Sequence, residues 1–485
     1  MPGLAKEANE LTRGEHYSIS GYPLSLNEAI RLTLKNNFDI EIARLERKII
    51  AYDIPIAKSI YDTTLTADVG YTVDEEEPSS ATLPKKQNIT EWNIGLSKKF
   101  SFGSILSLDF LNKRNSAAPS TAIINPYYKS DVEVSLTQPL LNNFFGFLDR
   151  GSVKLVRLDV SRLDLDELDN IEENISDVYT KYWDLVFAYE DRDSKKEALE
   201  YAENFLKITK DQYENGAAEE TDLFASQANV EERKRDLLKT DKIISDTSDE
   251  LKLAMNFFTE FTLSPQDKPT TSPVELNKET HILKALENRR DLESVKIELE
   301  KKNLSVRLKK NERLPQVDLI GTFTANGLAR EMIDAVGEAA SMDDPTYFIG
   351  VEVSYPLENR KARSEFRQSE LEKAQTIWDM KRVEKEIFVD IEKDIRNIIF
   401  KEKQVKYNEK IYELQKKKLE GEEKKYGFGR SSSDIIIRFQ DDVVNAKTGL
   451  SLALTDYEKA IISLKRNQNI LLDEIDWVTY EEVEK

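Results

Sequence analysis

Hydrophobic and polar residues alternate strictly in several short segments of this chain. Between positions 65 and 71, Leu65, Ala67 and Val69 face one way, while Thr66 and Asp68 face the other. Such alternation predicts a β-strand with one apolar and one polar face. The apolar face would meet a core in a soluble sheet and lipid in a membrane barrel, and the period does not distinguish the two. We expect no helix to cover these strands, because no neighbouring segment has a helical pattern. The other alternating segments are centred on Ile94, Leu108, Val134, Leu319 and Val353.

Longer segments have the period of a helix instead. Apolar residues between positions 168 and 189 recur at alternating steps of three and four, and a similar stripe occupies positions 450–464. This spacing predicts long amphipathic helices, and taken alone it favours an ordinary antiparallel coiled coil. The first stripe consists of Leu168, Ile171, Ile175, Val178, Tyr182, Leu185 and Tyr189, and the second of Leu450, Ala453, Tyr457, Ile461 and Leu464.

The motif Tyr-x-x-Gly interrupts the helical pattern twice, in QYENGAAEETD (212–222) and KYGFGRSSSD (425–434). Gly216 and Gly429 can adopt the positive φ that ends a helix and begins a reversal, so each motif predicts a tight helical turn. We call these turns tip 1 (212–222) and tip 2 (425–434). Tyr213 and Tyr426 precede the glycines by about one turn, and we expect both rings at the apex, available to a partner. Side chains that could cap the returning helices are Thr221, Asp222, Ser433 and Asp434.

The same order of elements occurs in both halves of the chain. LKNNFDI and LENRRDL precede the strands, while VEVSLTQPLL and VEVSYPLEN lie among them. The fold class is therefore expected to be mainly α with a sheet portion, built from a duplicated unit of strands and a long helical hairpin. Only the first half has an additional hairpin, within 92–110. This hairpin either extends the end of the sheet or widens the sheet, and we favour an appendage or extension.

The sequence also predicts how the chain is divided. The expected segments are an N-terminal extension (1–23), helices of the first repeat (24–60), its strands (61–140), its long hairpin (141–258), a linker (259–278), helices of the second repeat (279–314), its strands (315–357), its long hairpin (358–471) and a C-terminal tail (472–485).

Composition narrows the possible functions. The chain has 485 residues, 33% of them charged, and a net charge of −20, which argues against a nucleic-acid partner because phosphate binding requires a concentrated basic surface. It has no cysteine and two histidines, so thiolate catalysis and Cys-ligated zinc are excluded and histidine catalysis is not expected. No apolar run is long enough for a transmembrane helix. The first residues lack the apolar segment of a signal peptide and a cysteine for a lipid anchor, so we expect no intact leader here.

Several of these segments resemble one known family. LSLNEAIRLTLKNNFDIEIARLE, ERLPQVDLIGTFTANGL and YFIGVEVSYPLENRKARSEFRQSELEKAQ are similar to passages of TolC-like outer-membrane efflux proteins, and the likeness extends over about 24–471. The resemblance implies a homotrimer whose subunits each supply four strands to a 12-stranded outer-membrane β-barrel and their helices to a periplasmic α-barrel. It implies a passive exit duct for a tripartite efflux pump or type I secretion system, not an enzyme, with no cofactor or metal. The expected partners are outer-membrane lipid, a periplasmic adaptor and, through it, an inner-membrane pump.

The resemblance also assigns roles to residues of the tips. The positions that correspond to adaptor contacts are Tyr213, Gly216, Asp222, Tyr426, Gly429 and Asp434. One family pattern has carboxylates six and nine positions after the second tip glycine, where this chain has Ile435 and Arg438. Asp434 and Arg438 are spaced to pair on one helix face. The candidate residues of an entrance constriction are Asp434, Arg438, Asp441 and Asp442, for which a solvated helix face is the alternative.

A second interpretation remains open from the residues alone. An oligomeric coiled-coil scaffold without a membrane-spanning role would explain the heptads and the acidity. It would leave the duplicated strand segments unexplained.

Overall fold

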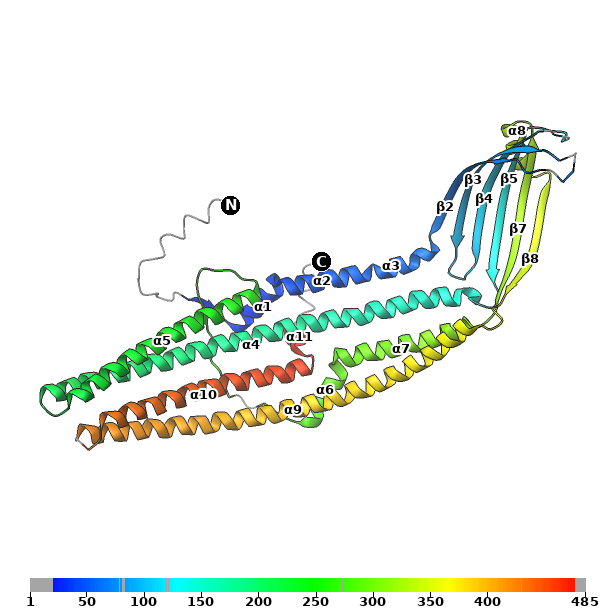
Figure 1. Ribbon diagram of the computed structural model, residues 1–485. Helices are drawn as coiled ribbons and strands as arrows, with labels where there is room; N and C mark the ends of the chain where they lie inside the picture. Colours follow the sequence, from blue (N-terminus) through cyan, green and yellow to red (C-terminus); the bar gives the residue numbers. More distant parts are fainter. Residues whose placement is uncertain are drawn as a thin grey trace, which may run out of the picture. The chain divides into compact units, whose positions relative to one another are not determined.

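The computed structural model describes residues 21–475, except 78, 81–82, 119, 121, 272–273 and 429 (Figure 1). The chain divides into two compact units, each considered by itself. The helical unit comprises Met1–Glu46, Asp166–Arg290 and Val383–Lys485, and the sheet unit comprises Arg47–Leu165 and Asp291–Arg382.

The helical unit is built mainly from the two predicted long hairpins. The outgoing helices α4 (Phe147–Glu214) and α9 (Arg360–Gly427) also contribute residues to the sheet unit, and the returning helices are α5 (Glu220–Met255) and α10 (Ser433–Asn467). The first hairpin occupies 147–255 and the second 360–467, each inside the segment expected for it, 141–258 or 358–471. The shorter elements are β1 (Tyr22–Leu24), α1 (Leu26–Asn36), α2 (Phe38–Ala51), β6 (Leu263–Pro265), α6 (Lys278–Asn288) and α11 (Leu471–Glu474).

The heptad stripe of α4 forms the core of this unit. Ile171, Ile175 and Leu185 are fully buried, as the period predicts. They do not form a simple coiled coil, because the same clusters include residues of α1, α2, α5 and the parallel pair β1–β6. Tyr182 is also fully buried and its hydroxyl donates to the Leu24 carbonyl at 3.0 Å, which ties α4 to β1.

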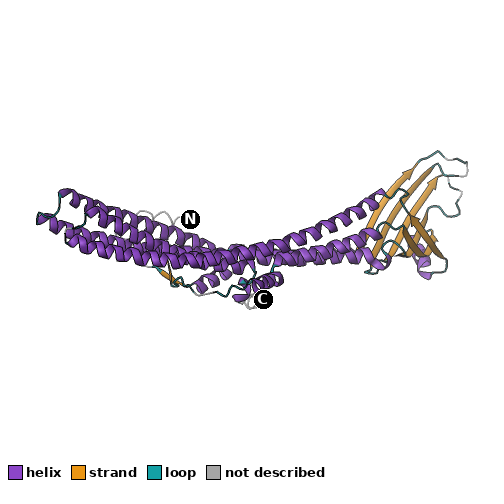
Figure 2. Cartoon of the chain, turned by 90° about the horizontal axis from the view of Figure 1, so that it is seen from below, coloured by secondary structure: helices purple, strands orange, loops and turns teal. Residues whose placement is uncertain are grey.

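The sheet unit contains one antiparallel sheet with the order β2-β3-β4-β5-β7-β8 (Figure 1). Figure 2 shows its strands in orange. The unit also contains α3 (Asp53–Lys58) and α7 (Arg290–Asn311, which begins at the last residue of the helical unit). The strands are β2 (Thr63–Asp74), β3 (Lys86–Lys99), β4 (Ile105–Ala118), β5 (Tyr127–Pro139), β7 (Gln316–Ala329) and β8 (Pro345–Ser354). Among the described residues β2 and β8 have one partner strand each, so this single chain presents an open sheet with two edges.

The additional hairpin corrects a sequence-based expectation. It is present as β3 and β4, turning at Gly103 with a φ of 87°, but these strands lie between β2 and β5 instead of outside the sheet. The hairpin is therefore neither an appendage nor an extension of the strand ends. The described sheet has six strands, not the four that the family resemblance implies.

A short helix was also missed. Residues 315–357 were expected to contain strands alone, and no helix was expected against the sheet, but α8 (Met332–Ser341) connects β7 to β8 and lies at one end of them (Figure 1). Ala335 and Ala339 of α8 are buried. A Cβ atom on Gly327 of β7 would overlap the Ala335 carbonyl, so the absence of a side chain there lets α8 approach the strand.

Candidate functional site

Tip 1 is a helix reversal formed as the motif predicts. Gly216 has a φ of 69°, and Ala217 N donates to the Gln212 carbonyl at 2.8 Å, which satisfies one of the last carbonyls of α4. The cap of α5 lies earlier than expected, because the N-cap is Glu219. Its side chain and that of Asp222 form a reciprocal capping box with the backbone of the first turn. Asp222 therefore supports the turn without being the N-cap itself.

Tip 2 has the same motif but a different environment. Tyr213 of tip 1 is 40% exposed, whereas Tyr426 of tip 2 is 9% exposed and packs on Phe205, with ring centroids 5.2 Å apart. The expectation that both rings remain available at the apex is therefore wrong for Tyr426 in this chain. The N-cap of α10 is Ser432, so neither Ser433 nor Asp434 caps it, and Gly429 lies outside the described residues.

A hydrogen bond joins the two hairpins close to their tips. Ser433 Oγ donates to Asp222 Oδ1 at 2.8 Å, and the Tyr426 hydroxyl lies 3.4 Å from Ser433 Oγ. Both contacts accompany the small apolar cluster of Phe205, Tyr426 and Ile436. The sequence suggested Asp222 and Tyr426 as contacts for a partner, but here they hold α4, α5, α9 and α10 together.

The candidate constriction residues of α10 divide into two groups. Asp434 and Arg438 are exposed and do not pair with each other in the described part of the chain; the Arg438 guanidinium lies 5.4 Å from the Phe439 ring centroid. Asp441 and Asp442 are instead engaged within the chain.

The two engaged carboxylates bind cations on neighbouring helices. Asp441 accepts a hydrogen bond from the buried Arg233 of α5, and Asp442 pairs with Lys418 of α9 at 2.7 Å. Arg233 Nε also donates to Asn229 Oδ1 at 3.1 Å. Neither Arg233 nor Lys418 was identified from the sequence, where each is one basic residue in a charged helix. A pattern of charge complementarity between α10 and the helices α5 and α9 could have indicated them.

Further from the tips, α10 presents cations to carboxylates of α4. Arg466 donates two hydrogen bonds of 3.0 Å to Asp169, and Lys459 and Lys447 pair with acidic side chains of α4. Burial opposes ionisation of Asp169, but Arg466 and the Asn469 amide hold the pKa of its carboxyl below the usual value. These ion pairs between α4 and α10, which we call the seam, join the two hairpins through charged hydrogen bonds.

A second network surrounds the fully buried carboxylate of Glu172. Its oxygens accept from the Leu471 backbone N–H at 2.9 Å, from Asn469 Nδ2 at 3.1 Å and from the Arg290 guanidinium. Each of these hydrogen bonds holds either the turn after α10 or the first residue of α7 against α4. The Glu172 carboxylate therefore has a structural role.

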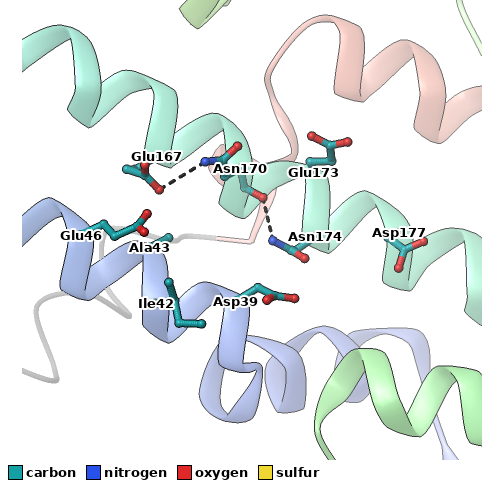
Figure 3. Close-up of a pocket in the computed structure, with 9 residues that line it drawn as sticks. All are labelled: Asp39, Ile42, Ala43, Glu46, Glu167, Asn170, Glu173, Asn174 and Asp177. Atoms are coloured by element: carbon teal, nitrogen blue, oxygen red, sulfur yellow. Dashed lines mark hydrogen bonds between the residues drawn. The ribbon is translucent and has the colours of Figure 1, made fainter.

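An acidic groove of about 450 Å³ lies between α2 and α4 (Figure 3). Burial and the nearby carboxylate of Glu46 raise the pKa of Glu167. Among the described residues, no basic, hydroxyl or thiol side chain lines the groove. In the part of the chain that the structure describes, no group of three or more possible ligands is arranged to hold a metal ion. The residues lining the groove are Asp39, Ile42, Ala43, Glu46, Glu167, Asn170, Glu173, Asn174 and Asp177.

The sheet has two chemically distinct faces. One transverse row of neighbouring residues is apolar across all six strands: Leu65, Leu96, Leu108, Val134, Phe323 and Tyr347. The next row points to the opposite face and is largely polar: Thr66, Gly95, Asp109, Glu133, Thr324 and Thr346. The apolar side chains remain exposed on this chain, with Val69 at 83% and Ile349 at 80%. Among the described helices, none has the length and apolarity needed to cross a membrane.

Several solved structures with this fold are outer-membrane proteins, among them outer-membrane channels. The Campylobacter jejuni outer-membrane channel CmeC is 16% identical, with a TM-score of 0.67 over 91% of this chain and 85% of that one. The outer-membrane protein VceC from Vibrio cholerae is 12% identical, with a TM-score of 0.66 over 91% of this chain and 95% of that one. CusC, described in connection with transmembrane channel formation, is 12% identical, with a TM-score of 0.70 and 95% of both chains covered. No protein-family model and no curated protein sequence matches the chain.

These identities establish the fold. The chain is predominantly helical with a sheet portion, as in the outer-membrane channels, and the resemblance to TolC-like proteins found in the sequence is confirmed at that level.

Proposed function

We propose that this chain is one subunit of a homotrimeric outer-membrane channel. The channel would be the passive exit duct of a tripartite efflux pump or a type I secretion system, with its helices in the periplasm. The observation that carries the proposal is the sheet with an exposed apolar face and two unpaired edges. An isolated chain in water would leave both exposed, whereas lipid can cover the face and further copies can pair the edges.

The two sheet edges are suited to each other. Because neighbouring strands alternate in direction through the sheet, β2 and β8 run in opposite directions. The β8 edge of one copy can therefore form an antiparallel ladder with the β2 edge of the next. A head-to-tail contact of this kind closes into a ring, and three copies is the number that the family resemblance implies.

The helices also have an uncovered apolar stripe. Large apolar side chains of α2, of α3 and of the residues next to α3 are each more than 40% exposed and recur at steps of three and four residues. Those in the helical unit are Phe38, Ile42 and Leu45, and those in the sheet unit are Ile49, Tyr52, Ile56 and Ile60. This is the spacing of a helix that packs on another helix. In the proposed trimer a neighbouring copy covers this stripe.

The polar face of the sheet would line the duct, which needs no catalytic chemistry. Its carboxylates, such as Asp109 and Glu133, and the net charge of −20 favour the passage of cations over anions.

The tips are proposed to dock on a periplasmic adaptor that is coupled to an inner-membrane pump. In tip 1, Tyr213 and Gly216 are exposed on this chain. In tip 2, Phe428 is exposed, whereas Tyr426, the counterpart of Tyr213, packs on Phe205 and is not proposed as a contact. Gly429, the counterpart of Gly216, is also proposed as a contact. Asp222 and Asp434 flank the tips. Asp434, Arg438, Asp441 and Asp442 are the proposed entrance residues, of which Asp434 and Arg438 are free to face a lumen.

Cysteine labelling tests the membrane part directly, because the native chain has no cysteine. Val69→Cys and Asp68→Cys place thiols on opposite faces of one strand, so membrane-embedded protein should react at position 69 with a lipid-phase probe and at position 68 with an aqueous probe. Equal aqueous labelling of both would overturn the barrel. The alternative, a coiled-coil scaffold, predicts solubility without detergent and this equal labelling.

A further inference from the structure

We propose that the outer-membrane barrel of this protein has eighteen strands, formed by three copies of a six-stranded sheet. The inference rests on the trimeric channel proposed above. It concerns how the hairpin β3–β4 changes the wall of that channel.

The hydrogen-bonded ladders place the hairpin within the wall. β2 pairs with β3 from Thr63–Lys98 to Asp74–Gln87, and β4 pairs with β5 from Ile105–Thr137 to Asn115–Tyr127. In the described sheet β2 and β5 are therefore separated by two strands. Removing the hairpin would leave a gap in the wall.

The hairpin has the same two faces as the other strands. Leu96 and Leu108 continue the apolar row between Leu65 and Val134, and they are 42% and 45% exposed. On the other face, Asn93 of β3 donates to Asp68 of β2 at 2.9 Å. The hairpin is thus built for contact with lipid on one side and with water on the other, as a barrel wall requires.

The turn of the hairpin is anchored to the base of the sheet. A Cβ on Gly103 would lie 2.8 Å from the Gly146 nitrogen, and a Cβ on Gly146 would overlap the Ser101 carbonyl, so the two backbones meet where neither residue has a side chain. Lys99 pairs with the largely buried Asp149 at 2.7 Å. These contacts fix the β3–β4 turn against the junction between β5 and α4.

All six strands are long enough to cross the hydrocarbon region. They contain between 10 and 14 residues, and about 9–11 tilted residues span a bilayer. Because barrel diameter grows roughly linearly with strand number, eighteen strands give a barrel about 1.5 times as wide as twelve. The membrane part would then form a broader mouth than the family resemblance implies.

Imaging at a resolution that separates the strands tests the strand count of the barrel. Native mass spectrometry tests the number of copies in the assembly. Both measurements use the full chain extracted from membranes in detergent. Three copies with eighteen strands support the inference. Three copies with twelve strands overturn it and leave the trimeric channel intact. Two copies with twelve strands, or soluble protein without a barrel, overturn the proposed function as well.

Engineered disulfides test the strand order in the membrane. Asp109→Cys with Glu133→Cys joins residues that face each other on β4 and β5, so this pair should cross-link under oxidation. Thr66→Cys with Glu133→Cys should not, because three strand spacings of about 4.8 Å separate β2 from β5. A cross-link of the second pair without the first would show that the hairpin lies outside the wall and overturn the inference.

Discussion

Ser433 donates a hydrogen bond of 2.8 Å to Asp222, and this bond connects the beginnings of the two returning helices. It is supported by Tyr426, which packs on Phe205 and lies 3.4 Å from the Ser433 hydroxyl oxygen. The two hairpins are therefore coupled near their tips, where a docking partner would act.

Removing this bond should loosen the tips. We expect Ser433→Ala to cost about 1–2 kcal/mol locally, because the Asp222 carboxylate loses a donor that reaches it from the other hairpin. Hydrogen exchange should become faster for amides of 205–222 and 426–440. Asp434→Ala is the matched control, since its side chain is exposed, and unchanged exchange in both variants would contradict the coupling.

Neutralising Glu172 should destabilise the helical unit. Glu172→Ala leaves Arg290, Asn469 and the Leu471 N–H without their acceptor in a buried site, which costs roughly 3 kcal/mol. Glu173→Ala changes the adjacent, exposed carboxylate and should alter stability by less than about 0.5 kcal/mol. Denaturant unfolding monitored by circular dichroism measures both, and equal losses would argue against the buried network.

Acidification should weaken the seam between α4 and α10. The pKa of Asp169 is lowered in the folded chain, so its contribution to stability is present above the ordinary aspartate pKa and is lost as the pH falls toward the lowered value. The melting temperature should therefore fall more steeply with acid in the native chain than in Asp169→Asn. Asp434→Asn, which removes an exposed carboxylate, should retain the native slope; identical slopes in all three proteins would contradict this assignment.

A single methyl group should displace α8. Gly327→Ala places a Cβ atom on the Ala335 carbonyl, and overpacking of this kind costs about 1–3 kcal/mol. Gly321→Ala lies on the same face of the same strand and meets nothing within 4 Å, so it is a close control. Proteolysis by a glutamate-specific enzyme should become faster at Glu331 and Glu338 in the first variant alone. Equal cleavage rates would show that α8 does not depend on this contact.

The long helices and the alternating strands could be predicted because their patterns are local. The stripe from Leu168 to Tyr189 and the alternation around Val69 each depend on spacing within one segment. Strand order is different in kind: β3 and β4 have the same pattern wherever they pair, so the alternation could not place them between β2 and β5. Helix α8 was missed because it is only ten residues long, lies between two strands and meets the sheet through the small residues Ala335 and Ala339.

Single residues of the tips also show that a local pattern does not predict contacts between distant segments. Tyr213 and Tyr426 occur in identical motifs, yet only Tyr426 is buried, because Phe205 from the other hairpin packs against its ring. Likewise Asp441 and Asp442 face Arg233 and Lys418, whose proximity depends on the packing of three helices. The sequence predicted where the helices reverse but not which side chains remain exposed at these turns.

The alternation of strand direction from β2 to β8 restricts how this architecture can vary. A subunit that gained a single strand would have two edge strands that run in the same direction. The antiparallel ladder proposed between neighbouring copies could then not form. In the proposed trimeric channel, the barrel can therefore gain or lose strands only by whole hairpins, and each such change adds or removes six strands at once.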